Sequence, residues 1–361
     1  MNEQKLVIPS YIKALLVLML IITIVYILII GKSLLVPLFL GGFIAILLTP
    51  IGNWLEGKKV SRVLSALISL ISGLIILLGF LTFIILQVAS FTKDLENVGD
   101  KLNKYLSDFD SWVLENFQVE TGVGQGIDQE YIIELLQSNS SNLAESILNT
   151  VGSLSGIVLL PVFTFFFLLY RDHLTDFIVQ LFKEKKQAHI KSEIRELRKL
   201  VQNYIIGIFK VMAILAVLNV AILLGLGIKH AVFFAVFAAL LNIIPYLGPV
   251  LGAVLPTIFA FLTKDSLFYP AAVVVAFLII QLIESNFLTP KIVGNNVNLN
   301  AFITFIGLLV GASIWGVIGM ILIIPTLAVL RKIFELSEAT NPYAFLFGEE
   351  KSNEDVDKQL D

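Results

Sequence analysis

Residues 279–294 read IIQLIESNFLTPKIVG, a stretch in which an apolar run acquires polar side chains before it reaches a proline. A carboxylate at membrane depth costs about 2.5–3.5 kcal/mol on insertion scales, so such a group usually faces a bundle interior or a wet cavity. We therefore predict that this stretch crosses a membrane and lines a transport pathway, with the carboxylate at its centre. The pathway residues predicted here are Gln281, Glu284, Asn286, Thr289 and Pro290.

Two apolar tracts on either side of this crossing are broken by glycine and proline. Residues 231–262 are interrupted by NIIPYLGP at 242–249, and residues 301–330 by GASIWG at 311–316. Proline and glycine free backbone groups that lipid cannot satisfy, so such breaks survive only against protein or trapped water. Paired interrupted segments are also the best sequence pointer to a transporter's binding site. The first break adds four predicted pathway residues, which are Asn242, Pro245, Gly248 and Pro249.

The same residues have a purely structural interpretation. Asn242 is suited to cap the half-helix that follows it, and the prolines and glycine of its break would then only shape the backbone. Gln281 and Glu284 would tie neighbouring helices together through hydrogen bonds. The sequence leaves both interpretations open.

The whole chain has the composition of an integral membrane protein. Of its 361 residues, 57% are hydrophobic and 15% are charged, and the mean hydropathy is +0.90. Ordinary soluble domains are about 45–50% apolar and about 25% charged. We predict an all-α polytopic membrane protein of about eight spans, whose last part contains two broken hairpins that are either re-entrant or fully crossing. The unbroken spans are predicted at 12–30, 34–51, 63–91, 153–170 and 204–227.

Charge is distributed unevenly along the chain and predicts its orientation. Residues 93–152 hold eleven Asp/Glu against three Lys, whereas residues 171–203 hold eight Lys/Arg against five Asp/Glu. Cytoplasmic loops carry the excess of basic residues. The predicted organisation is three spans at 1–92, an acidic extracytoplasmic helical segment at 93–152, a fourth span at 153–170, a basic cytoplasmic helix at 171–203, a transport core at 204–336 and a cytoplasmic tail at 337–361.

The acidic segment has helical apolar spacing, which predicts two amphipathic helices. These helices would cover the bundle or a neighbouring subunit of a homo-oligomer, or would form a lid over the pathway. Asp172 is predicted to cap a helix that begins at the membrane surface, where an acidic residue satisfies free N–H groups, with a role in transport as the alternative. The charged tail is predicted to be loose.

The chain lacks the residues that several classes of protein function require. The chain has no cysteine, and its three histidines, at 173, 189 and 230, do not have metal-ligand spacing. It has no Walker-type phosphate loop for ATP-driven pumping and no Ser/His dyad or paired aspartates in the spans. We expect no cofactor, no metal, no nucleic-acid partner and no enzyme activity.

Four motifs resemble those of the autoinducer-2 exporter family of bacterial inner-membrane permeases. They are PVFTFFFLLYRD from Pro161, NIIPYLGPVLGAVLP from Asn242, ESNFLTPKIVG from Glu284 and GLLVGASIWGVIGMILIIPTLAVLRK from Gly307. The resemblance implies about eight spans with both termini in the cytoplasm of a bacterium. It also implies transport, either export of the signalling furanose autoinducer-2 or sodium/proton exchange. One departure is Leu299-Asn300-Ala301, where many members have a His-Pro, and it argues against proton handling at that place.

Three functions remain open at this point. The first is a permease for a small polar solute such as autoinducer-2. The second is a monovalent cation/proton antiporter in which Glu284 alternates between protonated and ion-bound forms. The third is a membrane scaffold without transport, which would hold partners through the acidic segment and the basic helix.

Overall fold

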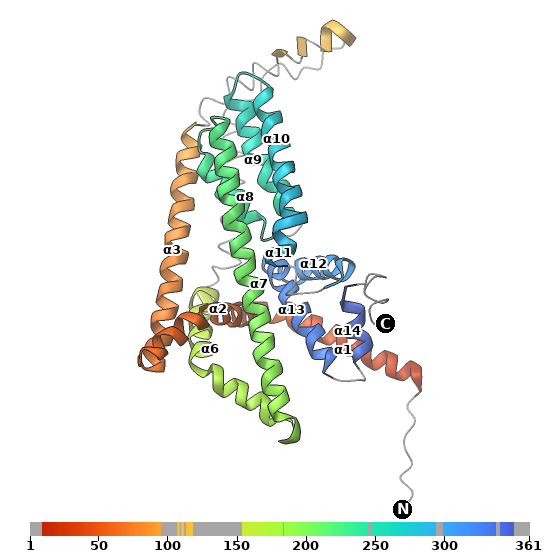
Figure 1. Ribbon diagram of the computed structural model, residues 1–361. Helices are drawn as coiled ribbons and strands as arrows, with labels where there is room; N and C mark the ends of the chain where they lie inside the picture. Colours follow the sequence, from red (N-terminus) through yellow and green to blue (C-terminus); the bar gives the residue numbers. More distant parts are fainter. Residues whose placement is uncertain are drawn as a thin grey trace, which may run out of the picture. The chain divides into compact units, whose positions relative to one another are not determined.

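The structure is a computed structural model that describes residues 9–94, 107–108, 110–111, 113–117, 154–182, 184–244, 247–293, 299–336 and 340–349 (Figure 1). Within these residues every regular element is a helix, apart from one isolated antiparallel bridge between Leu299 and Gly348. Seven of the described helices are long and apolar enough to cross a membrane, and three shorter apolar helices accompany them. The predicted polytopic all-α fold is therefore confirmed.

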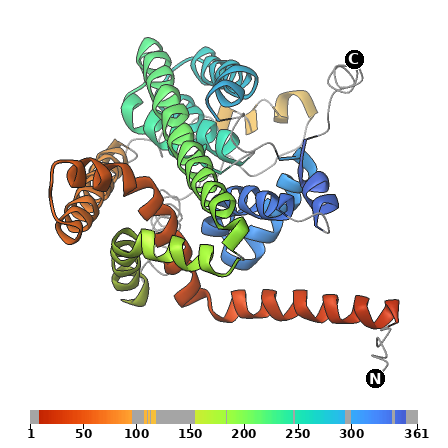
Figure 2. The same ribbon diagram turned by 60° about the horizontal axis from the view of Figure 1, so that its bottom comes forward.

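The chain divides into two compact units. The first unit comprises residues 1–45, 152–174 and 299–361, and the second comprises residues 46–151 and 175–298. The helices of the first unit are α1 (Ser10–Ile30), the start of α2 (Lys32–Gly57), most of α6 (Leu154–Gln180), α12 (Ala301–Trp315), α13 (Val317–Glu335) and α14 (Asn341–Phe347). In Figure 2, α1 is a straight helix. Most of its apolar side chains are exposed, as in a helix that faces lipid.

In the first unit, α12 and α13 form a hairpin that is packed through glycines. The chain reverses at Gly316, whose φ of 64° is a left-handed conformation that glycine adopts without strain. A Cβ added to Gly311 would lie 2.6 Å from the carbonyl oxygen of Gly319, so the two backbones are nearly in contact. The sequence placed the break across residues 311–316, but α12 continues through Gly311 and the turn occupies Gly316 alone.

The tip of this hairpin is anchored to α1. Trp315 donates a hydrogen bond of 2.9 Å from Nε1 to the backbone carbonyl oxygen of Leu28. Its ring is buried beside Val36 and Leu322. Because a buried indole N–H needs an acceptor and a carbonyl near a helix end lacks a partner in its own helix, this bond satisfies both groups.

The start of the C-terminal tail forms a helix, which corrects the prediction of a loose tail for residues 341–347, while residues 350–361 lie outside the described residues. Residues 341–347 form α14, whose Tyr343 and Phe347 rings both pack against Phe334 of α13, with centroid distances of 5.8 and 5.7 Å. The backbone N–H of Asn300 donates to the carbonyl oxygen of Phe347 at 2.8 Å. The segment thus joins the end of α13 to the start of α12, because its aromatic side chains bury apolar area that the charge count did not reveal.

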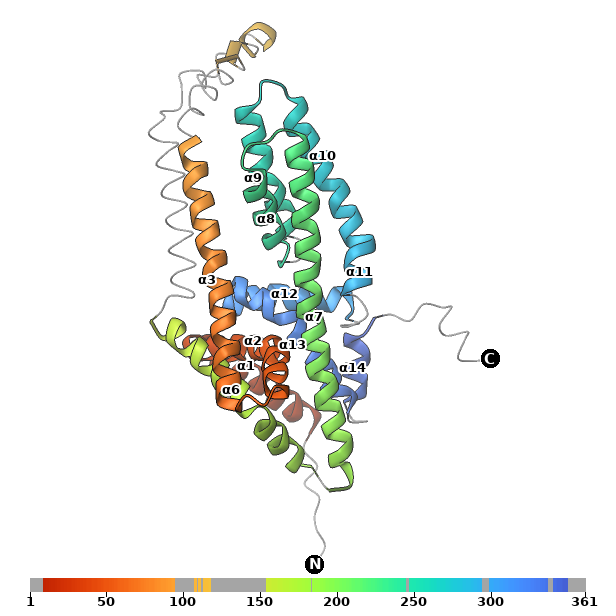
Figure 3. The ribbon, with the colours of Figure 1, turned by 60° about the vertical axis from the view of Figure 1, so that its left-hand side comes forward.

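The second unit contains the remainder of α2 and α6, α3 (Arg62–Asp94), α7 (Glu184–Gly225), α8 (Ala231–Leu241), α9 (Leu247–Thr263), α10 (Phe268–Ile283), the π-helix η3 (Glu284–Leu288) and α11 (Thr289–Ile292). Figures 1 and 3 show α8 and α10 lying alongside α7, while α9 packs against α8 and α10. Their shared core is rich in aromatic and small side chains, including Phe233, Phe234, Ala235, Phe259 and Phe277. Small residues allow close helix approach where lipid supplies no hydrophobic driving force.

Two predicted boundaries lie inside continuous helices. The predicted end of the fourth span at 170 falls within α6, so the interpretation of Asp172 as a helix cap is wrong. The predicted basic helix at 171–203 is divided between α6 and α7, and its part from residue 184 onward continues into the fifth span as one helix, α7, of 42 residues. At 1.5 Å per residue it is about 63 Å long, about twice the thickness of a hydrocarbon core, so a large part must extend into water. Of residues 95–153, most lie outside the described residues, and the role of the acidic segment stays a prediction.

Candidate functional site

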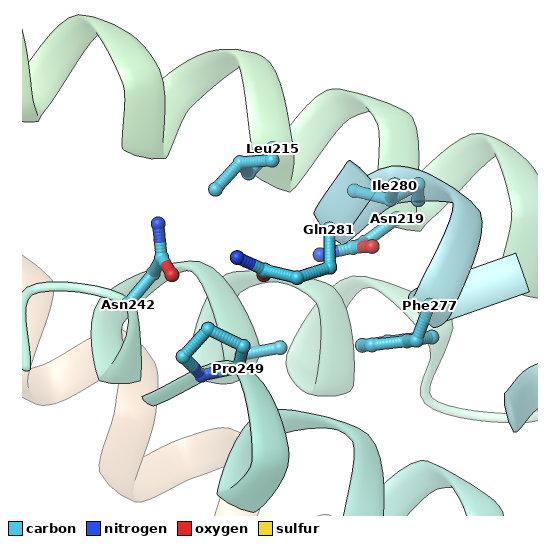
Figure 4. Close-up of a pocket in the computed structure, with 8 residues that line it drawn as sticks. Leu215, Asn219, Asn242, Pro249, Phe277, Ile280 and Gln281 are labelled. Carbon is cyan, nitrogen blue, oxygen red and sulfur yellow. The ribbon is translucent and has the colours of Figure 1, made fainter. Parts of the chain in front are cut away.

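A small cavity with polar walls lies inside the second unit, between α7, α8, α9 and α10 (Figure 4). It offers about 20 Å³ of space for water centres, which is room for about one water molecule. Three amide side chains contribute to the wall, and they come from three different segments. The lining residues are Leu215, Asn219, Ala238, Asn242, Pro249, Phe277, Ile280 and Gln281.

The wall formed by α8 and α9 results from the break in the apolar tract at residues 242–249. Helix α8 ends at Leu241, and Asn242 follows as its C-cap residue rather than as an N-cap of the next helix. A Cβ on Gly248 would overlap the Leu241 carbonyl group, and a Cβ on Gly252 would lie 2.9 Å from the Cα of Ala238. Only glycine permits these approaches, so α8 and α9 pack as one tight hairpin.

Glu284 lies next to this cavity and is buried, with 8% of its surface exposed. Its Oε2 accepts a hydrogen bond of 2.7 Å from Nε2 of Gln281. Its Oε1 accepts a hydrogen bond from the hydroxyl of Thr289. Both carboxylate oxygens therefore have donors, which offsets the cost of burying the group.

The π-helix η3 creates this arrangement. The backbone N–H of Thr289 donates to the carbonyl oxygen of Glu284, five residues earlier, so the Thr289 side chain lies over the carboxylate. Pro290 supplies the cause, because it has no N–H to donate to the carbonyl four residues before it and its ring would clash there. Single π turns inside α-helices are frequent at functional sites.

Gln281 connects the two parts of the site. It lines the cavity and also donates to the carboxylate of Glu284, whereas Glu284 is not among the described residues that line the cavity. In Figure 4 the Gln281 amide extends between Asn242 and Asn219. A change at the carboxylate would therefore alter the orientation of an amide that faces the cavity.

The structure brings together some of the predicted pathway residues and not others. Asn242, Pro249 and Gln281 share the cavity, while Gly248 is buried at the turn that shapes it. Asn286 and Pro290 are exposed, and Nδ2 of Asn286 donates to the Leu282 carbonyl of its own helix at 2.8 Å. Pro245 lies outside the described residues. A role for any of these residues in transport stays a prediction.

Asn219 is a cavity residue that sequence reasoning missed. It is 4% exposed and lies within the apolar run AILAVLNVAILLG of α7, at residues 213–225. Its Oδ1 is buried and has no hydrogen-bond partner among the described residues. The signal that could have found it is the single amide in an otherwise apolar span, because a polar group at membrane depth usually faces the bundle interior.

The site has no charged side chain among the described residues of its cavity wall. The described part of the chain also has no group of three or more His, Cys, Asp or Glu that could hold a metal ion. The Gln281 amide of the wall is hydrogen-bonded to one charge-bearing group, the carboxylate of Glu284. The chemistry available is therefore hydrogen bonding by amides, with one carboxylate behind them.

A multi-pass helical bundle with a polar cavity at a broken hairpin is the architecture of a membrane transporter. The chain belongs to the AI-2E family of transporters, whose sequence profile matches residues 15–338. It is 23% identical to the AI-2 transport protein TqsA of Escherichia coli K12, over 88% of this chain and 90% of TqsA.

Two further relatives are also named as transport proteins. The chain is 24% identical to YrrI of Bacillus subtilis, over 83% of this chain and 85% of YrrI. It is also 24% identical to YhhT of Escherichia coli K12, over 88% of this chain and 89% of YhhT. The protein is therefore a multi-pass membrane transporter of a bacterial family, and membership of a family of transport proteins agrees with the prediction of a non-enzyme.

Proposed function

We propose that this protein moves a small polar solute, with autoinducer-2 as the first candidate, across the bacterial inner membrane, and that both of its termini are cytoplasmic. The observation that carries the proposal is the buried carboxylate of Glu284, held by Gln281, which also lines a polar cavity. The name of the relative TqsA, an AI-2 transport protein, supports the choice of solute. The placement of the basic loops supports the orientation.

In the proposed mechanism, a solute binds where the amides of Asn242 and Gln281 meet, and Glu284 holds the Gln281 amide in place. The cavity has room for about one water molecule, so the solute enters only when a wall moves. The α8–α9 hairpin is the wall suited to move, because its two helices are joined by glycine contacts and would shift together. Alternating displacement of this hairpin would open the site to each side of the membrane in turn.

Monovalent cation/proton exchange is a second candidate, favoured by the burial of Glu284. In that case the carboxylate would exchange its two hydrogen-bond donors for a cation or a proton. The scaffold interpretation depends on segment 93–152, which lies mostly outside the described residues, and it stays a prediction. The same holds for assembly into a homo-oligomer.

The test uses purified protein in proteoliposomes, as wild type and as Glu284→Gln. Uptake of autoinducer-2 and sodium-driven proton movement, followed with a pH-sensitive dye, are measured on the same vesicles. We expect autoinducer-2 uptake above empty vesicles and its loss in Glu284→Gln, while Glu115→Gln, which alters an exposed carboxylate, behaves as wild type. Wild-type vesicles without solute uptake contradict the first proposal. Proton exchange that is lost in Glu284→Gln, without solute uptake, supports the second.

A further inference from the structure

The buried amide of Asn219 is not explained by the packing of α7. Only 4% of its surface is exposed, and its Oδ1 has no hydrogen-bond partner among the described residues. Leaving a buried acceptor unpaired costs about 1–3 kcal/mol. A leucine at this position of an apolar helix would avoid that cost. An unpaired buried group in a native protein needs an explanation, such as a functional role or a water or ion that the polypeptide does not supply.

The surroundings of Asn219 indicate which kind of ligand fits. The other polar groups of the cavity are the amides of Asn242 and Gln281, and the remaining described lining residues are apolar. An amide both donates and accepts hydrogen bonds, and a hydroxyl group does the same. A charged ligand would lose its hydration here without an opposite charge at the wall, which is costly. The wall therefore suits uncharged hydroxyl-bearing molecules.

The size of the cavity indicates how such a molecule would bind. The space of about 20 Å³ admits one water or one hydroxyl-sized group, so a larger solute would fit only after the walls move apart. In the mechanism proposed above, the α8–α9 hairpin moves away from α7 and α10, the two helices that carry Asn219 and Gln281. That movement would make room for a solute hydroxyl group to donate to the Asn219 oxygen, which has no hydrogen-bond partner among the described residues.

We propose that Asn219 is a solute-binding residue and that it selects uncharged solutes that carry hydroxyl groups. This inference rests on the transport function proposed above and specifies the solute class of that same site. Asn219 contributes an amide from α7 to the cavity wall that the amides of Asn242 and Gln281 also line (Figure 4). The loss of one neutral hydrogen bond, followed by burial of an apolar group in its place, weakens binding about tenfold.

The experiment compares wild type with Asn219→Leu, Asn219→Ser and Asn203→Leu in proteoliposomes. Asn203→Leu is the matched control, because it makes the same replacement in the same helix at a residue that does not line the cavity. Uptake of autoinducer-2 is measured against competing erythritol, which is neutral, and gluconate, which is anionic. Erythritol binding to the detergent-solubilised proteins is measured separately by calorimetry, and melting temperatures report on folding.

We expect erythritol to compete and gluconate not to compete in wild type. Asn219→Leu should raise the half-saturation concentration and the erythritol dissociation constant about tenfold, while Asn203→Leu leaves both unchanged. Asn219→Ser keeps a group that donates and accepts, and it should retain measurable binding even if the leucine variant folds poorly.

Three results would overturn the inference. The first is an Asn219→Leu protein with wild-type affinity, whatever its melting temperature, because Asn219 would then hold only a structural water. The second is equal competition by gluconate, which would refute the solute class. The third is the absence of erythritol binding to wild type. A fourth result separates the two proposals. If wild-type protein binds erythritol through Asn219 but shows no uptake, the transport proposal is contradicted while the binding site is still supported.

Discussion

Replacing Thr289 by valine tests whether the π-helix serves to hold the carboxylate of Glu284. Valine keeps the shape and the β-branch of threonine but removes the hydroxyl that donates to Oε1 of Glu284. The other carboxylate oxygen keeps its 2.7 Å bond from Gln281. The variant therefore leaves one oxygen of a buried carboxylate without its donor, with little change in side-chain volume.

The expected magnitude follows from this single bond. A hydrogen bond to a charged group contributes about 1.5–3 kcal/mol, and each 1.4 kcal/mol is a factor of ten. If the carboxylate must hold Gln281 against the cavity during transport, Thr289→Val should lower solute uptake about 10- to 100-fold at low solute concentration. Thr289→Ser keeps the hydroxyl and should stay within about threefold of wild type, which allows for its lost methyl group.

The assay is initial uptake of autoinducer-2 into proteoliposomes containing equal amounts of each variant. A double variant of Thr289→Val with Glu284→Gln should be no worse than Glu284→Gln alone, because the hydroxyl acts only through that carboxylate. Wild-type uptake by Thr289→Val would refute the reasoning. So would equal losses in the valine and serine variants, since volume rather than the hydrogen bond would then matter.

Two further predictions concern the first unit and are read as melting temperatures in detergent. Gly311→Ala would place a methyl group 2.6 Å from the Gly319 carbonyl oxygen, so we expect destabilisation of about 1–3 kcal/mol, whereas Gly79→Ala, with open space around its Cβ, should be neutral or stabilising. A Gly311→Ala protein that melts like wild type would show that the α12–α13 hairpin is not held by this contact. Removal of residues 340–361 should lower the melting temperature, because it deletes α14 and the hydrogen bond to the start of α12, while removal of residues 350–361 spares both. Equal effects of the two truncations would contradict a structural role for α14.

Hydropathy and helix breakers predicted the class of this protein well, because both are local properties of the chain. The apolar runs correspond to helices that are long enough to cross a membrane. The break at residues 242–249 lies where α8 ends and α9 begins. The boundaries of α6 and α7 were predicted less well, since charge marks where water begins and a helix can continue through that surface.

The candidate site depended on contacts that no local pattern records. Burial of Glu284 could be expected from the cost of a carboxylate in lipid. Its bonds to Gln281 and Thr289 depend on a π turn, which changes the angular position of every later side chain on the helix. Asn286, two residues from the carboxylate, is exposed because side chains two positions apart on a helix point to nearly opposite faces.

Apolar runs were sufficient to predict a helical membrane protein, and the broken tracts and one acidic residue favoured transport, because lipid penalises each charge and each free backbone group wherever it occurs. Which polar side chains meet could be known only from the folded chain. Asn219, Asn242 and Gln281 lie in separate helices or at their ends, and they share one cavity because glycine contacts set how closely α8 and α9 approach. That approach is a property of packing between distant segments, and a single sequence does not encode it in any one stretch.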